Sequence, residues 1–288
     1  MRDRGDFVKF TVEDFRRWEH KKITLLGMSG VGKTHLSAML RQHQWYHYSG
    51  DYRIGTRYLD ESILDLIKEQ AMQVPFLSEL LRNDWIYIRN NIKISDLGPV
   101  LSYVGKLGNP ESGGVPLVDF EFRQAQYRDA EIAAMLDVPA FIEKGQQIYG
   151  YPHFVNDVGG SLCELDEPDI IDLLVEHTLM LYIKVTDTDE EQTLIARAQS
   201  DPKPLYYRPA FLAEQLTTYL AEQDLSYAAE MDPDEFTRWV FPRLFHSRVP
   251  RYEDIAKRGY TVTSREVGQV RDEQDFLQLL ETAIARAD

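Results

Sequence analysis

Cysteine is nearly absent from this sequence, since Cys163 is its single occurrence in 288 residues. One cysteine excludes an intramolecular disulfide and a cysteine-based zinc cluster. We expect Cys163 to be a small buried hydrophobic residue.

Positive charge is also scarce, because the chain has 32 Lys and Arg but 47 Asp and Glu, for a net charge of −15. That balance argues against a nucleic acid or an anionic membrane as the main partner, although a local basic patch can still bind an anionic ligand.

Long hydrophobic runs are absent as well. No apolar stretch approaches the roughly 18 residues of a membrane span. The charged start, Met1 to Asp6, has no signal-peptide core. The sequence shows no internal repeat, and its 43% hydrophobic and 27% charged residues are ordinary for a globular protein. We therefore expect a soluble, cytoplasmic protein.

One motif stands out against this ordinary background. It fits the pattern G-x-x-x-x-G-K-[ST] at every specified position and reads Gly27-Met28-Ser29-Gly30-Val31-Gly32-Lys33-Thr34. An apolar, β-prone segment, 22–26, precedes it. Residues 34–40 follow with Leu36, Met39 and Leu40 at helical spacing. Strand, glycine loop and helix together predict a phosphate-binding loop.

The chemistry of phosphate binding explains these residue types. Glycines let the loop wrap closely, so that backbone N–H groups and the N-terminus of the following helix face the phosphate oxygens. Lys33 can reach the β- and γ-phosphates, and the Thr34 hydroxyl can ligate Mg²⁺. We expect ATP and Mg²⁺ as cofactors, with the nucleotide bound by Gly27, Ser29, Gly30, Val31, Gly32, Lys33, Thr34 and His35.

Strand and helix patterns alternate along the rest of the chain. Strands are predicted over 22–26, 45–49, 153–157, 179–185 and 259–263. Helices are predicted over 59–72, 76–81, 117–136, 140–149, 167–177, 189–199, 209–223, 232–247 and 273–287, after a short amphipathic element with Phe7, Phe10, Phe15 and Trp18. This alternation indicates a three-layer α/β/α fold with a mainly parallel five-stranded sheet.

We interpret residues 1–288 as a single domain with a large helical insertion. Residues 52–150 form the insertion and are expected to bind an acceptor molecule. Within them, 105–116 is rich in glycine and proline and forms either a substrate-facing loop or an idle surface connection. Residues 197–208 are expected to form a lid-like segment.

Asp157 is a second candidate site residue, because it ends a predicted strand at the edge where open α/β sheets bind ligands. It can organise Mg²⁺ with Thr34, or it can simply cap the following turn. Asp51, Arg53 and Arg57 follow another strand and can hold an acceptor, although either arginine can instead be a solvated ion-pair partner. Each of these residues therefore keeps a functional and a structural interpretation.

Arg197 and Arg208 flank a polar turn with two prolines. Such a turn suits a closing lid that brings positive charge to a transferred phosphoryl group. A plain surface corner with two solvated arginines is the alternative.

Three segments resemble the nucleoside monophosphate kinases, adenylate kinase above all. They are His47-Tyr48-Ser49-Gly50-Asp51, Phe154-Val155-Asn156-Asp157-Val158-Gly159 and Leu181-Tyr182-Ile183-Lys184-Val185. The resemblance implies a P-loop NTPase fold, a catalytic role for Lys33, and Mg²⁺ organised by Thr34 and Asp157. It also implies acceptor binding by Arg53 or Arg57, and closure of Arg197 and Arg208 over the phosphates.

The sequence departs from that family in three places. About 100 residues separate the two predicted strand-end aspartates, which suggests a bulkier or different acceptor. The arginine that follows the family's Asp-Gly strand is missing, since Val158-Gly159-Gly160-Ser161 stands there. The last 60-odd residues extend past the family's usual end.

The leading functional hypothesis is a Mg²⁺-dependent kinase that transfers the ATP γ-phosphoryl group to a small molecule. The alternative is a regulatory ATPase or nucleotide switch that controls a protein partner, and a third is a nucleotide-binding protein without catalysis. A GTPase is disfavoured because Lys184-Val185-Thr186-Asp187 keeps only Lys and Asp of the guanine-reading motif. A protein partner or a homodimer is possible, and the acceptor is not named by the sequence.

Overall fold

The computed structural model describes residues 10–185 and 187–287, and the chain divides into two compact units. The first unit comprises Met1–Gly50, Met135–Ser200 and Phe241–Asp288, and the second comprises Asp51–Ala134 and Asp201–Val240. The second unit thus lacks 135–150 of the predicted insertion and includes 201–240, a segment distant in sequence. Among the described residues, no helix is both long and apolar enough to cross a bilayer.

A five-stranded sheet forms the centre of the first unit, in the order β2-β3-β1-β4-β5. Every neighbouring pair is parallel. The strands are β1 (Lys22–Leu26), β2 (Trp45–Ser49), β3 (His153–Asp157), β4 (Leu179–Lys184) and β5 (Tyr260–Thr263). Most of their residues are buried, as expected for a parallel sheet that is covered on both faces.

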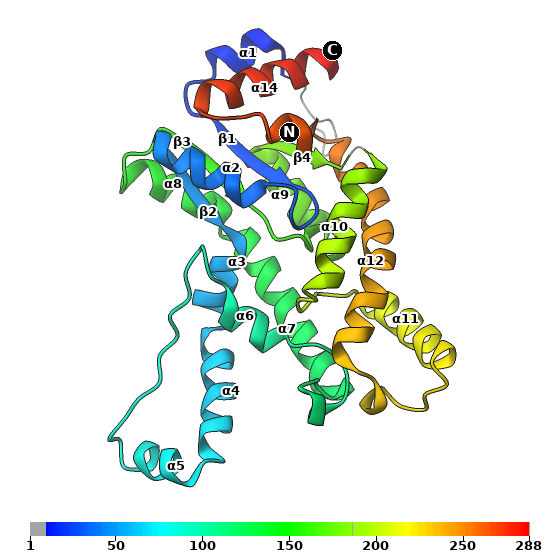
Figure 1. The fold of residues 1–288 in the computed structure, drawn as a ribbon. Coiled ribbons are helices and arrows are strands. Elements are labelled where there is room, and N and C mark those ends of the chain that lie inside the picture. Colours follow the sequence, from blue (N-terminus) through cyan, green and yellow to red (C-terminus); the bar gives the residue numbers. More distant parts are fainter. Residues whose placement is uncertain (1–9, 186, 288) are drawn as a thin grey trace. The chain divides into compact units, whose positions relative to one another are not determined.

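Ring contacts show which helix covers which face of the sheet. Side chains alternate along a strand, so Trp45 and Tyr46 of β2 point to opposite faces. Trp45 meets Phe276 of α14 (Glu273–Ala287) with ring centroids 5.7 Å apart. Tyr46 instead packs against Phe141 and Gly145 of α8 (Val138–Gln147). The predicted three-layer α/β/α architecture is therefore confirmed (Figure 1).

The crossover helices follow from the strand order. The chain runs from β1 through α2 (Lys33–Leu40) to β2, and from β3 through α9 (Pro168–His177) to β4. These two crossovers run in opposite directions along the sheet, so right-handed connections place α2 and α9 on opposite faces. The first unit also contains α1 (Val12–Arg17), η1 (Arg41–His43), η4 (Leu162–Glu164), α10 (Thr188–Ser200) and α13 (Ser264–Val267). Phe7 of the predicted amphipathic element lies outside the described residues.

Helix α12 (Pro233–Ala256) is longer than the sequence predicts. The prolines in this region suggested an end near residue 247, but the helix continues through Pro242 and Pro250. A proline removes one backbone donor from a helix. Tertiary packing offsets that loss here, because Tyr252 is fully buried and its ring stacks on Tyr182 of β4 at 5.6 Å.

The second unit is helical. Its elements are α3 (Gly50–Arg53), the π-helical turn η2 (Ile54–Tyr58), α4 (Asp60–Met72), α5 (Pro75–Arg82), α6 (Gly98–Val104), η3 (Pro110–Ser112), most of α7 (Leu117–Leu136), α11 (Pro209–Glu222), η5 (Ala228–Glu230) and the start of α12. Helix α6 was not predicted, because its seven residues are too few to establish a helical period.

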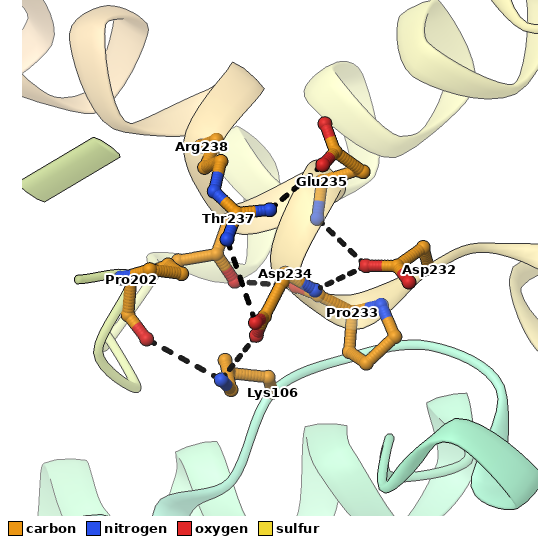
Figure 2. Close-up of polar contacts among 8 residues, drawn as sticks. All are labelled: Lys106, Pro202, Asp232, Pro233, Asp234, Glu235, Thr237 and Arg238. Atoms are coloured by element: carbon orange, nitrogen blue, oxygen red, sulfur yellow. Dashed lines mark hydrogen bonds and ion pairs between the residues drawn. The ribbon is translucent and has the colours of Figure 1, made fainter. Parts of the chain in front are cut away.

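The loop 105–116 is tied to distant parts of the second unit. Its Leu107 and Val115 are buried, and the Asn109 amide donates to the Met231 carbonyl at 2.8 Å. Figure 2 shows the Lys106 ammonium between the Asp234 carboxylate and the Pro202 carbonyl. This loop therefore holds the segments 201–202 and 231–234 in place, which favours its interpretation as a structural connection.

Candidate nucleotide-binding site

The phosphate loop joins β1 to α2 and has a backbone that only glycine adopts easily. Gly27 has a φ of +143°, and a Cβ there would lie 2.6 Å from the Ile183 carbonyl oxygen. Gly32 has a φ of +102° and caps the N-terminus of α2. A side chain at either position would strain the backbone, and at Gly27 it would also collide with β4. The loop conformation thus depends on the glycines of the motif.

Lys33 is the first residue of α2, and its side chain folds back over the loop. Its ammonium donates to the carbonyls of Gly27 and Met28 at 2.7 and 3.0 Å. The residue is only 6% exposed. A buried ammonium requires hydrogen-bond partners, and the loop carbonyls supply them. The positive charge of Lys33 is consequently fixed at the phosphate loop.

The remaining motif residues differ in exposure. Ser29, Gly30, Thr34 and His35 are exposed, whereas Val31 is buried. Thr34 lies in the first turn of α2, where backbone N–H groups have no partner within the helix and the helix dipole is positive. Exposed polar groups at such a helix start are suited to an anionic ligand.

Asp157 ends β3 beside the strand that leads into the phosphate loop. In the parallel register its Cα pairs with that of Leu25, two residues before Gly27. The aspartate is 5% exposed, and its Oδ2 lies 3.7 Å from Nε2 of His47 on β2. Sequence analysis did not identify His47, because its position beside Asp157 depends on the strand order.

Arg197 borders the same loop from α10. A Cβ built on Gly30 would lie 4.0 Å from its Nη1 and 3.1 Å from the Leu194 side chain. Arg197 is exposed, so its guanidinium can move toward a bound anion. The first unit therefore brings together Lys33, Thr34, Asp157 and Arg197 around the predicted phosphate loop.

Helix α12 fixes the loop that follows Asp157. Both the Arg248 Nη1 and the Tyr252 hydroxyl donate to the Gly160 carbonyl at 2.9 Å. Gly160 in turn lies against the phosphate loop, since a Cβ on it would be 3.2 Å from the Ser29 backbone nitrogen. No local sequence signal marks Arg248 or Tyr252, which contact Gly160 across about 90 residues of chain.

A buried chain of side-chain hydrogen bonds crosses the three central strands below this site. The Asn156 amide donates to Thr24 Oγ1 at 3.2 Å, and Thr24 Oγ1 lies 2.7 Å from Thr178 Oγ1. Thr178 donates onward to the Leu174 carbonyl at 2.7 Å. The chain links β3, β1 and the start of β4, and so fixes the strands that carry Asp157 and the phosphate loop relative to one another.

The predicted acceptor-binding residues belong to the second unit. Asp51 lies in α3, just beyond the end of β2, and its Oδ1 accepts a hydrogen bond from the Tyr127 hydroxyl at 3.3 Å. The Arg53 guanidinium lies 5.6 Å from the centre of the Tyr58 ring. Arg57 is exposed in the π-helical turn η2, a form of helix that is frequent at functional sites.

Arg208 caps the N-terminus of α11. Two residues before it, Tyr206 is buried and stacks on the Tyr127 ring with centroids 5.8 Å apart. Tyr127 thus connects Asp51 with the segment that carries Arg208. The substrate-binding role of Asp51, Arg53 and Arg57 and the catalytic role of Arg208 stay predictions.

A Mg²⁺ ion at the phosphate loop would need few ligands from the protein, because nucleotide phosphates and water supply the others. Within residues 10–185 and 187–287, no cluster of three or more His, Cys, Asp and Glu side chains is placed to hold a metal. Thr34 and Asp157 fit the different arrangement expected for Mg²⁺ in a nucleotide site, where phosphates and water complete the shell.

A parallel sheet with a glycine loop between its first strand and the next helix is the arrangement that the sequence resemblance to P-loop NTPases implies. No protein-family model matches the chain, and neither does any curated protein sequence. Among solved structures, the chain is similar to the 1.7 Å crystal structure of shikimate kinase from Bacteroides thetaiotaomicron. The two are 16% identical, with 93% of this chain and 96% of that chain covered and a TM-score of 0.37. The resemblance of the sequence to adenylate kinase stays a prediction.

Proposed function

We propose that this protein is a Mg²⁺-dependent kinase that transfers the γ-phosphoryl group of ATP to a small-molecule acceptor. The observation that carries the proposal is the position of Lys33. Its ammonium is buried and bonded to two carbonyls of a glycine loop at the carboxyl edge of a parallel sheet. A lysine ammonium fixed at a glycine loop can bind the negatively charged phosphate oxygens of a nucleotide.

The residues around Lys33 would have separate roles in phosphoryl transfer, namely phosphate binding and Mg²⁺ binding. Backbone amides of the loop and the N-terminus of α2 bind phosphate oxygens. Thr34 and Asp157 would hold Mg²⁺, directly or through water. When bound, this ion neutralises phosphate charge. Catalysis of this kind relies on positioning and charge stabilisation rather than on covalent chemistry.

Arg197 supports a kinase in particular. Its exposed guanidinium borders Gly30, where it can add positive charge to a transferred phosphoryl group. For the acceptor we propose Asp51, Arg53 and Arg57, while Arg208 of the lid-like segment would close over the phosphates together with Arg197. An aspartate and several arginines suit an acceptor that carries a hydroxyl group together with an anionic group.

The test is phosphoryl transfer from [γ-³²P]ATP to a panel of small metabolites. The proposal expects product formation with one acceptor class, and slow ATP hydrolysis without it. Lys33→Ala should lower transfer by about 10² to 10³-fold, because one preorganised cation is lost from the transition state. Lys257→Ala is the matched control, since Lys257 is an exposed lysine whose partner is Asp254.

Two outcomes would contradict the proposal. Full transfer by Lys33→Ala would remove the active-site assignment. Tight ATP binding without a response to any metabolite would instead favour the regulatory ATPase. Asp157→Asn should shift the Mg²⁺ titration to higher concentration, and an unchanged titration would return Asp157 to a capping role.

A further inference from the structure

A helical hairpin in the second unit exposes many large apolar side chains. We call residues 60–89 the arm: it contains α4, α5 and the segment that follows them. Its exposed aromatic residues are Phe76 (68%), Trp85 (67%) and Tyr87 (78%), and its exposed aliphatic ones include Val74 (46%). All four lie within 14 residues of chain, so exposed apolar side chains are concentrated in α5 and the residues next to it.

The arm has too few internal partners to cover this surface. Helix α5 packs against α4, and Ser78 is its one buried residue. Figure 1 shows α5 at the end of α4, with a long connection returning the chain to α6. Helix α4 is covered in part by α6 and η2, but a pair of helices leaves much of the apolar surface of α5 open, whereas four helices can cover one another in a bundle. A further pair of helices is therefore the natural complement of the arm.

We propose that this complement is the arm of a second copy, so that the protein forms a symmetric homodimer. In a two-fold contact a patch faces itself, and a patch of one charge would repel its copy. The end of the arm that carries the exposed rings, residues 74–89, instead has both signs, since Glu79 and Asp84 are matched in number by Arg82 and Arg89. It is therefore locally balanced in a chain whose net charge is −15. This balance fits self-association better than a strongly charged partner.

The exposed area is sufficient for a dimer. With about 200 Å² for a whole aromatic side chain, the three exposed rings offer ~400 Å². The aliphatic residues Ile67, Val74 and Ile86 raise the exposed apolar area to ~600 Å² per copy. Two copies would bury ~1,200 Å², which is the lower end of stable interfaces. We therefore expect a dissociation constant on the order of micromolar.

Sedimentation velocity over about 1 to 100 µM tests the proposal. The mass should rise with concentration from 33.4 kDa to twice that value. The double variant Phe76→Glu, Tyr87→Glu should stay monomeric, with an unchanged circular dichroism spectrum. Phe122→Glu is the matched control, because Phe122 is 62% exposed on α7 outside the arm. This control should dimerise as the unsubstituted protein does.

Trp85 provides a second readout that is specific to the arm. Its fluorescence should become less accessible to iodide as the protein concentration rises. The comparison with Trp85→Phe isolates this signal from the other three tryptophans, which include the buried Trp45. Two results would overturn the proposal: a monomer at every concentration, or a dimer that persists in the arm double variant. A monomer that instead sediments with phosphatidylcholine vesicles would also overturn it and assign the arm to a lipid surface.

Discussion

Thr24→Val tests whether the buried hydrogen-bond chain stabilises the centre of the sheet. Thr24 lies on β1 and is fully buried. Because Thr178 donates its proton to the Leu174 carbonyl, Thr24 donates to Thr178 and accepts from Asn156. Valine has nearly the same shape but no hydroxyl. The substitution therefore removes two hydrogen bonds with little change in packing.

The expected loss of stability is about 2 kcal/mol. The main cost is the Asn156 amide, which is buried and loses its Thr24 acceptor, a penalty of ~1–3 kcal/mol. The lost bond to Thr178 adds to this, while the better burial of a methyl group offsets part of it. For a chain of 288 residues we expect the melting temperature to fall by about 3 to 4 °C.

Urea unfolding monitored by circular dichroism measures this loss. The double variant Thr24→Val, Asn156→Leu provides the control, because it removes the donor together with its acceptor. Replacing both partners of a buried hydrogen bond by apolar groups is nearly neutral. The double variant should therefore be more stable than the sum of the two single substitutions implies. A loss below about 0.5 kcal/mol for Thr24→Val, or strictly additive losses, would show that the hydrogen-bond chain does not stabilise the sheet.

Three further predictions concern other parts of the molecule. Gly27→Ala should weaken ATP binding at least about 100-fold in calorimetry, because its Cβ would lie 2.6 Å from a carbonyl oxygen. Gly150→Ala should leave binding intact, because Gly150 also has a positive φ, +71°, but has open space around it. Burial lowers the pKa of His153 below its ordinary value of 6.5, so the neutral form is favoured in the folded state and stability should fall as the pH drops below 6.5. His153→Asn should flatten this dependence in melting curves, and an unchanged slope would contradict the assignment. The Lys106–Asp234 pair should contribute about 0.5 kcal/mol in a double-mutant cycle, since both side chains are partly exposed; a coupling of zero would show that other bonds hold the loop.

The sheet could be predicted well from the sequence because local patterns determine it. All five strands match their predicted bounds within one residue at each end, and β1, β2 and β3 match fully. Each is a short run of apolar or β-branched residues between turn residues, and periodicity detects such runs. The phosphate loop could also be predicted from the sequence. Its glycines are needed because the backbone angles of the loop strain other residues.

Features that depend on distant contacts could not be predicted. The continuation of α12 past Pro250 relies on the burial of Tyr252 against β4, which local propensity does not show. The assembly of the second unit from 51–134 and 201–240 depends on contacts such as the one between Lys106 and Asp234. Its two segments are separated in sequence by residues 135–200, which contain β3 and β4.

In the candidate site, too, residues set by local patterns could be predicted and residues brought together by distant contacts could not. Lys33 and Thr34 follow from a contiguous motif, and Asp157 follows from its place at a strand end. His47 could be placed beside Asp157 only with the strand order β2-β3-β1. Arg248 likewise lies far along the chain from the Gly160 carbonyl that it binds.

Isothermal titration of ATP with Mg²⁺ into the unsubstituted protein and into Lys33→Ala tests whether Lys33 belongs to a nucleotide-binding site. We expect a dissociation constant on the order of micromolar for the unsubstituted protein, and at least about 100-fold weaker binding for Lys33→Ala, which loses the buried ammonium at the phosphate loop. Equal affinities, or no binding by either protein, would contradict this expectation.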